Sequence, residues 1–245
     1  MLKTTHQNFL TKYAEPDNHY SYDEAPVSYV KGNKATPEIL RRALDNNQLS
    51  VRMAVVEHPN ATPEILHKAL NDEDGGVRHA AIKHPNVTSE IIHKGLNDKD
   101  FMVRAAAVKH PNATPEMLHK AIHDEDSYVR ETAAFHQNAT LEMLHKALAD
   151  EKSFIRKAAV THPKATSEML YKALDDDNHY VRYAAVTHPN ATPEILHKAL
   201  DNKDYFVRSA AIYHPNANVE TLNKALTDEH VLIRDNAAQR LLAMN

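Results

Sequence analysis

The stretch that decides the fold reads His188-Pro189-Asn190-Ala191-Thr192-Pro193-Glu194-Ile195-Leu196-His197-Lys198-Ala199-Leu200, and Val207-Arg208 follows shortly after it. Close versions of this text recur every 26 residues without a slip in the spacing. A fixed period of about 20 to 50 residues is typical of a solenoid or another repeat array. The copies begin at Gly32, which opens a degenerate version, and at His58, His84, His110, His136, His162, His188 and His214.

Each copy carries the signals of two short helices. The two helices are clearest in the stretch that starts at Val51 and runs across one copy boundary. A first helix is predicted from Val51 to His58, and Pro59 breaks it. Thr62 can cap a second helix, with Pro63 in a first-turn position where a missing N–H costs nothing. We therefore expect two helices per repeat, with some 3₁₀ geometry in the shorter one. The second helix presents an apolar stripe made of Ile65, Leu66, Ala69 and Leu70.

The order Val-Arg, small apolar residues, His/Asn-Pro, Thr-Pro-Glu, Leu and Asp resembles the leucine-rich repeat variant family and, more distantly, HEAT repeats. The resemblance covers residues 32 to about 240. It implies an all-α fold, a right-handed α-solenoid of about eight two-helix repeats of 26 residues. The family's repeat is usually slightly shorter, so we expect the extra length in the loop around Asp72 to Gly76. Some members are associated with a cysteine-bound iron–sulfur cluster, which this cysteine-free chain cannot share. The resemblance therefore implies a fold and no particular activity.

Residues 1–31 do not share the repeat, and residues 32–245 are predicted to form the solenoid with its C-terminal cap. The end of a solenoid would expose an apolar face, so residues 1–31 are expected to cap it. The alternative is an arm that becomes ordered on a partner. The aromatic residues available for either role are Phe9, Tyr13, Tyr20, Tyr22 and Tyr29.

The composition indicates a soluble protein. The net charge of -4 gives no general attraction to nucleic acid or to anionic membranes. The first eight residues lack the apolar core of a signal peptide, and no apolar run approaches the ~20 residues that span a bilayer. We therefore expect a cytoplasmic protein. The absence of cysteine excludes disulfides and thiolate metal sites.

An arginine follows the Val or Ile of every copy, and an aspartate lies six residues before most of these arginines. A guanidinium and a carboxylate form a planar bidentate pair that can tie a loop to the next helix. We predict a structural ladder in preference to a ligand-binding row of arginines, since charges in half-buried turns are usually paired. The arginines are Arg52, Arg78, Arg104, Arg130, Arg156, Arg182, Arg208 and Arg234, and the aspartates are Asp72, Asp98, Asp124, Asp150, Asp176 and Asp228.

Histidine is unusually abundant, with 18 residues. Equivalent histidines in adjacent repeats would lie ~8–10 Å apart, whereas all ligands of one zinc ion lie within ~2.1 Å of it. A row of repeated histidines therefore cannot chelate a metal, and no metal or cofactor is predicted. We expect the histidines that open each copy to bond carbonyls at the helix end. A second set is expected to face solvent, namely His67, His93, His119, His145 and His197.

A basic residue also recurs on the second helix, which raises the alternative of nucleic-acid binding. Each one lies four residues after a glutamate, as in Glu64 and Lys68, and such pairs neutralise the stripe. Nucleic acid is therefore the second hypothesis. The row consists of Arg42, Lys68, Lys94, Lys120, Lys146, Lys172, Lys198 and Lys224.

Two further kinds of chemistry are disfavoured. The Asp-x-Asp loops, such as Asp72/Asp74, lack the glycine and the later glutamate of a calcium loop. An enzyme needs one unique constellation of reactive groups, whereas most polar residues here are copied in register. We therefore predict no catalytic residues and no enzyme.

Positions where the copies disagree are the best candidates for recognition. The residue before the Val or Ile is often aromatic, and Tyr and Phe are frequent anchors in binding hot spots. The first hypothesis is a protein-binding scaffold, either an adaptor or an inhibitor; the third is a spacer or a self-associating unit. The rings could instead pack between successive helices. The candidate partner-binding residues are Phe101, Met102, Tyr128, Phe154, Tyr180, Tyr183, Tyr205, Phe206 and Tyr213.

Overall fold

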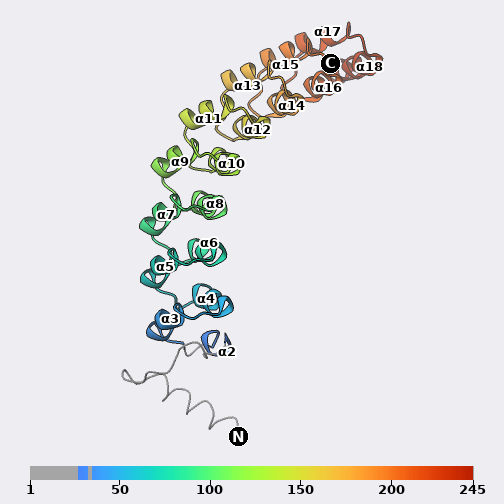
Figure 1. Ribbon diagram of the computed structural model, residues 1–245. Coiled ribbons are helices and arrows are strands. Elements are labelled where there is room, and N and C mark those ends of the chain that lie inside the picture. Colours follow the sequence, from blue (N-terminus) through green and yellow to red (C-terminus); the bar gives the residue numbers. More distant parts are fainter. Residues whose placement is uncertain (1–26, 33–34, 245) are drawn as a thin grey trace, which may run out of the picture. The chain divides into compact units, whose positions relative to one another are not determined.

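A computed structural model describes residues 27–32 and 35–244 of the chain (Figure 1). All secondary structure in these residues is α-helical. The chain divides into two compact units, Met1–Ala113 and Thr114–Asn245, which we call unit 1 and unit 2 and describe separately. The predicted aromatic cap residues Phe9, Tyr13, Tyr20 and Tyr22 lie outside the described residues.

The described part of unit 1 starts with the four-residue helix α2 and continues as helix pairs. Within the unit, α2 packs against α3 and α4, and Val30 of α2 is fully buried. Because α2 contacts α4 as neighbouring even-numbered helices contact one another, it belongs to the same layer as α4 and α6. The helices are α2 (Val27–Val30), α3 (Pro37–Ala43), α4 (Leu49–Val56), α5 (Pro63–Ala69), α6 (Gly75–Lys83), α7 (Ser89–Gly95) and α8 (Phe101–Lys109).

Unit 2 contains five helix pairs, and its last helix is the longest among the described residues, with 14 residues. The helices are α9 (Pro115–Ala121), α10 (Ser127–Phe135), α11 (Leu141–Leu148), α12 (Ser153–Thr161), α13 (Ser167–Ala173), α14 (His179–Thr187), α15 (Pro193–Ala199), α16 (Tyr205–Tyr213), α17 (Val219–Ala225) and α18 (Val231–Met244). From α3/α4 to α17/α18 the described residues form eight pairs, so the prediction of an all-α solenoid of two-helix repeats is confirmed.

The helix ends follow the local sequence. Thr62 accepts a hydrogen bond from the backbone N–H of Ile65, and Pro63 opens α5. Asp74 caps α6 by accepting from the N–H of Gly76 at 2.8 Å. Such side-chain caps satisfy donors that have no partner within the helix. Both helices of each pair are α-helices, and the shorter one ends in i→i−3 hydrogen bonds of the 3₁₀ type, such as that from the Asn71 N–H to the Lys68 carbonyl oxygen at 3.0 Å.

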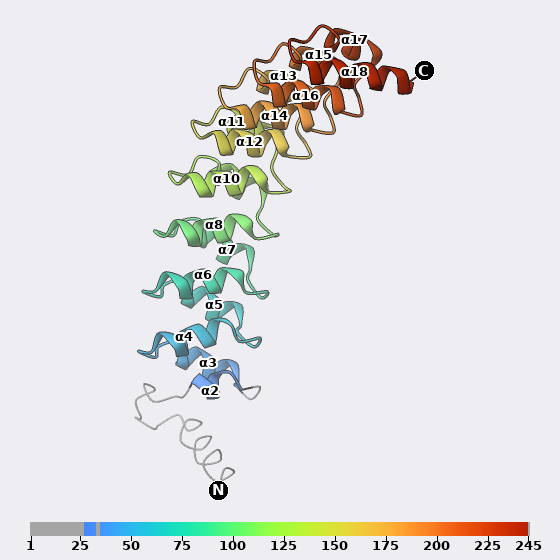
Figure 2. The ribbon, with the colours of Figure 1, turned by 90° about the vertical axis from the view of Figure 1, so that its right-hand side faces the viewer.

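Within each unit the helices form two layers, the odd-numbered helices on one side and the even-numbered helices on the other (Figures 1 and 2). The core lies between the layers, where Val77, Ile65 and Leu66 are almost completely buried. The even-numbered helices pack against one another more extensively than the odd-numbered helices do. Small residues such as Ala81 and Ala185 allow this close approach.

No helix in the described part of the chain is both long and apolar enough to cross a membrane.

Candidate partner-binding surface

The repeated arginines form a ladder, but their carboxylate partners differ from the prediction. Arg78 donates from Nε and Nη2 to both carboxylate oxygens of Asp98, 20 residues further on, at 2.8 and 2.9 Å. The predicted partner, Asp72, lies six residues before Arg78. It accepts a hydrogen bond from Arg78 only through its backbone carbonyl oxygen, at 2.9 Å. Stacking places the loop of the next repeat beside the guanidinium, and chain distance does not reveal this. The hydrogen bond to Asp98 also raises the pKa of Arg78.

The same bridge recurs in both units. In five of these bridges the guanidinium binds the carbonyls of its own loop and both carboxylate oxygens of an aspartate in the following loop, so it joins consecutive repeats. The arginine and aspartate side chains are at most 13% exposed, which makes these pairs part of the frame. The bidentate pairs are Arg52–Asp72 and Arg78–Asp98 in unit 1, and Arg130–Asp150, Arg156–Asp176 and Arg208–Asp228 in unit 2.

One arginine–aspartate pair of the ladder, which we call a rung, is replaced by a weaker pair in unit 2. Arg182 is 5% exposed, like Arg208, but Asn202 stands where the other rungs have aspartate. The Nε atom of Arg182 donates to the amide oxygen of Asn202 at 3.3 Å, and Nη2 lies 3.9 Å from a carboxylate oxygen of Asp204. This guanidinium therefore lacks the bidentate carboxylate that the other rungs have.

The histidines that open each copy also join repeats. The Nε2 atom of His84 lies 3.1 Å from the carbonyl oxygen of His58, one repeat earlier. Its Nδ1 atom accepts the backbone N–H of Asn86 at 3.0 Å, so the proton of the neutral ring lies on Nε2. We expected bonding to the last turn of the same helix, and the acceptor instead belongs to the preceding repeat. Burial lowers the pKa of His84, which favours the neutral ring.

Arg240 ends this histidine series. It lies 26 residues after His214, the place of the next motif histidine, and its Nη1 donates to the carbonyl oxygen of His214 at 3.1 Å. The same atom donates to the carbonyl of Ile212. Sequence reasoning missed this residue, although its 26-residue distance from His214 was available as a signal.

Three lysines of the row, Lys68, Lys198 and Lys224, pair with an aspartate of the preceding repeat. The Nζ atom of Lys198 lies 2.7 Å from Asp175 of the preceding repeat, and Lys224 is equally close to Asp201. The predicted pairing with a glutamate four residues earlier is found for Arg42 and Glu38, at 2.7 Å. The lysine side chain reaches the loop of the neighbouring repeat because the helices stack in register. These pairs leave less positive charge for phosphate groups than a free lysine row would.

A cavity of about 510 Å³ is lined by residues of α13, α15 and α17. On one side the Lys198 ammonium lies 4.0 Å from the centre of the Tyr171 ring while it binds Asp175. His197 also lines the cavity, and its buried Nδ1 atom has no hydrogen-bond partner. The other histidines of its row, such as His67 and His93, are exposed as predicted. Among the described residues, no group of three or more His, Cys, Asp or Glu side chains is arranged to hold a metal ion.

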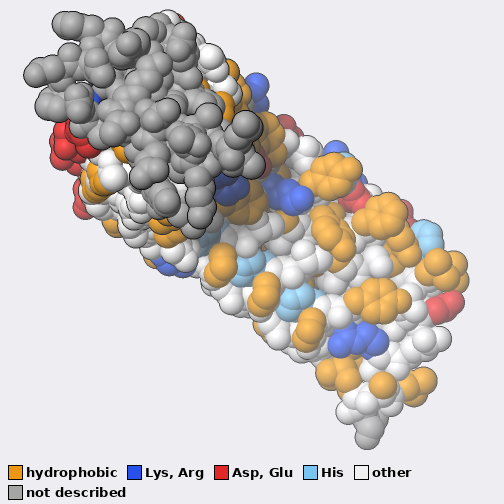
Figure 3. Space-filling view, turned by 90° about the horizontal axis from the view of Figure 1, so that it is seen from below, with side chains coloured by type: hydrophobic (Ala, Val, Ile, Leu, Met, Phe, Trp, Pro, Cys, Tyr) orange, Lys and Arg blue, Asp and Glu red, His pale blue; other side chains and the backbone are white. Residues whose placement is uncertain are grey.

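The arginine and histidine bridges are the same from repeat to repeat. By contrast, the exposed side of the even-numbered helices of unit 2 varies between repeats. Most of the predicted binding residues in this unit project from it. Hydrophobic side chains are distributed in rows over the part of the surface that Figure 3 leaves uncovered by grey. The exposed fractions are 42% for Tyr128, 41% for Phe154, 60% for Tyr180, 44% for Tyr183, 69% for Phe206 and 57% for Tyr213.

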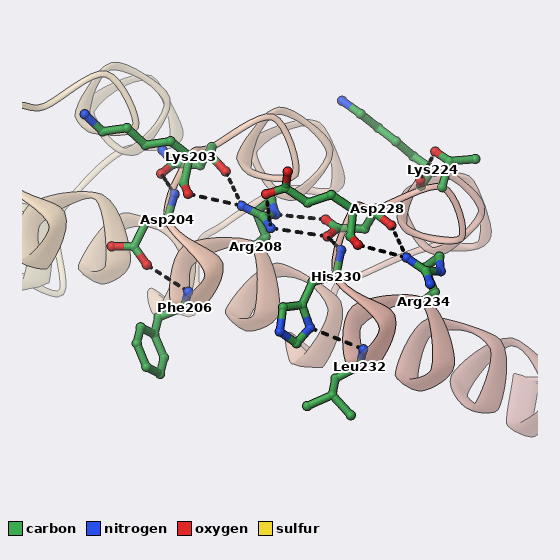
Figure 4. A network of polar contacts seen from close by, with 12 residues as sticks. Lys203, Asp204, Phe206, Arg208, Lys224, Asp228, His230, Leu232 and Arg234 are labelled. Atoms are coloured by element: carbon green, nitrogen blue, oxygen red, sulfur yellow. Dashed lines mark hydrogen bonds and ion pairs between the residues drawn. The ribbon is translucent and has the colours of Figure 1, made fainter.

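Four of these residues, with Leu232, form one line, which we call the ring row: Tyr128, Phe154, Tyr180, Phe206 and Leu232. Each is the second residue of an even-numbered helix. Figure 4 shows Phe206 and Leu232 projecting to the same side, away from the arginine ladder. The alternative that the rings are buried between successive helices does not describe these side chains, which are all more than 40% exposed.

The other predicted residues lie elsewhere. Tyr205 is half-buried, because its ring packs on His230 with the ring centres 4.4 Å apart. Phe101 and Met102 begin α8 in unit 1 and are 41% and 44% exposed. Phe101 and Met102 are therefore candidates of unit 1, and the remaining candidates belong to unit 2.

The candidate binding residues did not include two exposed rings of unit 2, although the sequence already marked Phe135 as a ring that is difficult to bury. Phe135, at the end of α10, is 53% exposed, and Tyr171, on α13, is 41% exposed. Phe135 lies seven residues after Tyr128, and residues seven apart share one face of a helix. That spacing supports placing Phe135 on the same face as Tyr128, whereas Tyr171 lies on α13 in the odd-numbered layer.

Comparison with known proteins agrees with this description of the fold. Residues 89–109 match the family described as the HEAT repeat associated with sister chromatid cohesion. A leucine-rich repeat variant with a novel repetitive structural motif is similar with a TM-score of 0.71 and 23% identity, over 83% of this chain and 81% of that chain. The YibA protein of Escherichia coli gives a TM-score of 0.49 and 18% identity, over 91% of this chain and 99% of that chain. No match was found among curated proteins.

The chain is therefore a helical repeat protein whose fold is similar to that of the leucine-rich repeat variant, as its sequence indicated. Helical repeat arrays typically present extended surfaces that bind other proteins, and they are generally scaffolds without catalytic activity.

Proposed function

We propose that this protein is a non-enzymatic binding scaffold, an adaptor or an inhibitor, that holds a protein partner on the even-numbered helices of unit 2. The observation that carries the proposal is the ring row, where large side chains are exposed at a helix position that unit 1 fills with Ser50, Gly76 and Met102. Clustered aromatic side chains at a surface are typical anchors of protein interfaces. Within unit 2, buried polar bridges join consecutive repeats and stiffen the surface that carries the rings.

Binding of nucleic acid is less well supported. A phosphate-binding stripe needs ammonium groups that are available to the ligand. Lys198 and Lys224 are engaged by Asp175 and Asp201 at 2.7 Å, and Lys68 lies 2.6 Å from Asp45.

The test is affinity capture from the native cell with three forms of the intact protein, followed by mass spectrometry. The first form is unchanged, and the second carries Phe154→Ala, Tyr180→Ala and Phe206→Ala. The matched control carries Lys83→Ala and Lys109→Ala on the equivalent helices of unit 1, where both side chains are exposed. We expect a partner that the ring variant loses and the control retains.

Equal recovery of every captured protein by the ring variant would contradict the proposal. The spacer or self-association hypothesis makes a different prediction, a change in sedimentation with protein concentration and no captured partner. Circular dichroism of all three forms establishes that the helices are intact.

A further inference from the structure

Two basic side chains contact the ring at the centre of the ring row. The Nζ atom of Lys157, on α12, lies 5.9 Å from the centre of the Tyr180 ring on α14. The imidazole of His179 packs on the same ring, with the ring centres 3.8 Å apart. The centre of the row therefore carries basic groups among its exposed rings.

The positive charge of Lys157 is not neutralised by a carboxylate. Lys157 is exposed, and it forms no ion pair with any residue that the structure describes. An aromatic ring attracts a cation through its quadrupole but has no net charge, so the contact with Tyr180 leaves the charge in place. By contrast, Lys198 and Lys224 of the odd-numbered layer are each paired with an aspartate at 2.7 Å.

A hydroxyl donor accompanies this charge. Tyr183 is the equivalent of Lys157 on the next even-numbered helix, and α12 and α14 pack against each other. Tyr183 also stands three residues after Tyr180, so the two rings are neighbours on one face of α14. The side chain of Tyr183 is 44% exposed, and its phenol can donate a hydrogen bond to an anionic group. An anion bound here would therefore meet a cation and a hydrogen-bond donor beside apolar ring faces.

The exposed carboxylates of the adjacent loops contact the arginine ladder. Glu229, in the loop before α18, contacts Arg208 at 2.9 Å. Asp177, in the loop before α14, contacts Arg156 in the same way. Figure 4 shows Phe206 projecting away from the ladder. Carboxylates that contact the ladder thus do not face the rings, and they leave the charge of Lys157 available to a partner.

A polyanion fits this surface poorly. The residue equivalent to Lys157 is Glu131 on α10 and Asp235 on α18, so carboxylates stand at both ends of the same series of positions. A chain of phosphates or an anionic membrane would extend over several repeats and would be repelled by these carboxylates. A single carboxylate at the centre of the row would meet the positive charge of Lys157 instead.

We propose that the centre of the ring row binds an acidic segment of a protein partner, in which one aspartate or glutamate is flanked by apolar side chains. This inference rests on the proposed function and names the chemistry of the partner. The carboxylate pairs with the ammonium group of Lys157 and accepts a hydrogen bond from Tyr183. The apolar side chains cover Phe154, Tyr180 and Phe206. Because this cover excludes water, it strengthens the attraction between the two charges.

The probe is a displayed library of short random peptides, selected separately on the intact protein and on its Lys157→Glu variant. We expect the unchanged protein to enrich peptides that combine Asp or Glu with aromatic or aliphatic residues, and Lys157→Glu to lose the acidic preference. In fluorescence anisotropy, a selected peptide should bind Lys157→Gln about threefold more weakly and Lys157→Glu about tenfold more weakly, because the reversed charge repels the peptide. The ring variant should lose more, since aromatic anchors dominate such interfaces.

The matched control is Lys172→Glu. Lys172 is an exposed lysine of the same unit, on α13 in the odd-numbered layer, and its reversal changes the net charge by the same amount. It should leave the affinity for the selected peptides unchanged, and circular dichroism establishes that each variant is folded. A selection without an acidic preference, or an equal loss of affinity in Lys172→Glu, would overturn the proposal. Tighter binding of a single-stranded DNA oligonucleotide than of the selected peptides would also overturn it.

The two proposals can fail separately. If a captured partner depends on the rings but binds Lys157→Glu normally, the scaffold function stands and the acidic segment is wrong. If the ring variant retains every partner, both proposals are wrong.

Discussion

Units 1 and 2 share one internal frame and differ on the outer side of their even-numbered helices. Arg78 and Arg208 bind their aspartates in the same bidentate way, each with an Nε–oxygen distance of 2.8 Å. At the second residue of the even-numbered helix, however, unit 1 has Ser50, Gly76 and Met102. Unit 2 has the ring row at that position. Because stacking works with either set, stability does not explain the rings.

The last turns of these helices also carry more aromatic side chains in unit 2 than in unit 1. Unit 1 ends them with charged residues such as Lys83 and Lys109, whereas Phe135 and Tyr213 end α10 and α16. A repeat frame can thus be kept constant while one stretch of its surface is changed for recognition. The comparison teaches that the frame and the surface can be tested independently.

The largest effect should come from breaking the shared frame. Arg78→Leu and Arg208→Leu each leave a buried aspartate without its counter-charge. We expect each to lower the free energy of unfolding by about 3 kcal/mol, because an unpaired buried charge is costly. Urea unfolding followed by circular dichroism measures this.

Arg41→Ala is the control for this experiment. Arg41 forms an exposed pair with Glu38, which water screens, so its removal should change the free energy of unfolding far less than the loss of a buried arginine. A large difference between the losses in units 1 and 2 would contradict the claim of a common frame.

Acidification should weaken the histidine bridges of both units. Burial lowers the pKa of His84, His162 and His214, so the unfolded chain takes up protons before the folded protein does. Stability is therefore complete above about pH 6.5 and falls as the pH drops from there through the folded-state pKa values. The slope is at most about 1.4 kcal/mol per pH unit for each histidine.

Urea unfolding at a series of pH values checks this prediction. His162→Asn should make the pH dependence shallower, whereas substitution of the exposed His67 should leave it unchanged. An unchanged slope in His162→Asn would show that these rings do not control acid stability.

Repairing the weak rung of unit 2 should have a smaller, positive effect. Asn202→Asp would offer Arg182 the bidentate carboxylate that the other rungs have. We expect a gain of about 1 kcal/mol, seen as a higher melting temperature. The reverse change at an intact rung, Asp176→Asn, should lower the melting temperature. If Asn202→Asp is neutral, the pairing at this rung contributes little.

The smallest effect on stability should come from the rings themselves. Phe154→Ala, Tyr180→Ala and Phe206→Ala remove side chains that are at least 41% exposed. We expect each to change the free energy of unfolding by no more than about 0.5 kcal/mol. A loss of several kcal/mol in denaturant unfolding would show that the rings belong to the core and would remove the basis of the proposed surface.

Much of the fold could be predicted because its signals are local or periodic. A threonine followed by a proline, as at Thr62 and Pro63, caps and opens a helix in each repeat that has this pair. The 26-residue period implies that the copies stack. The partners of charged residues could not be predicted in this way. Arg78 has Asp72 closer along the chain, but Asp98 is the carboxylate that stacking brings to its guanidinium.

The candidate site divides in the same way. Disagreement between copies identified Tyr180 and Phe206 as unusual, and their spacing placed them in one row. Their exposure could not be predicted, because the same position allows burial between helices or projection into solvent. Tyr205 illustrates the difficulty, since it is adjacent to Phe206 yet packs on His230.

By itself, the sequence determined that this protein is an array of paired helices, because capping residues and apolar stripes act over a few residues and recur at a constant interval. Only the tertiary structure decided which charges pair and which rings remain at the surface. Those outcomes depend on how one repeat stacks on the next, and that packing brings together residues 20 or 26 positions apart.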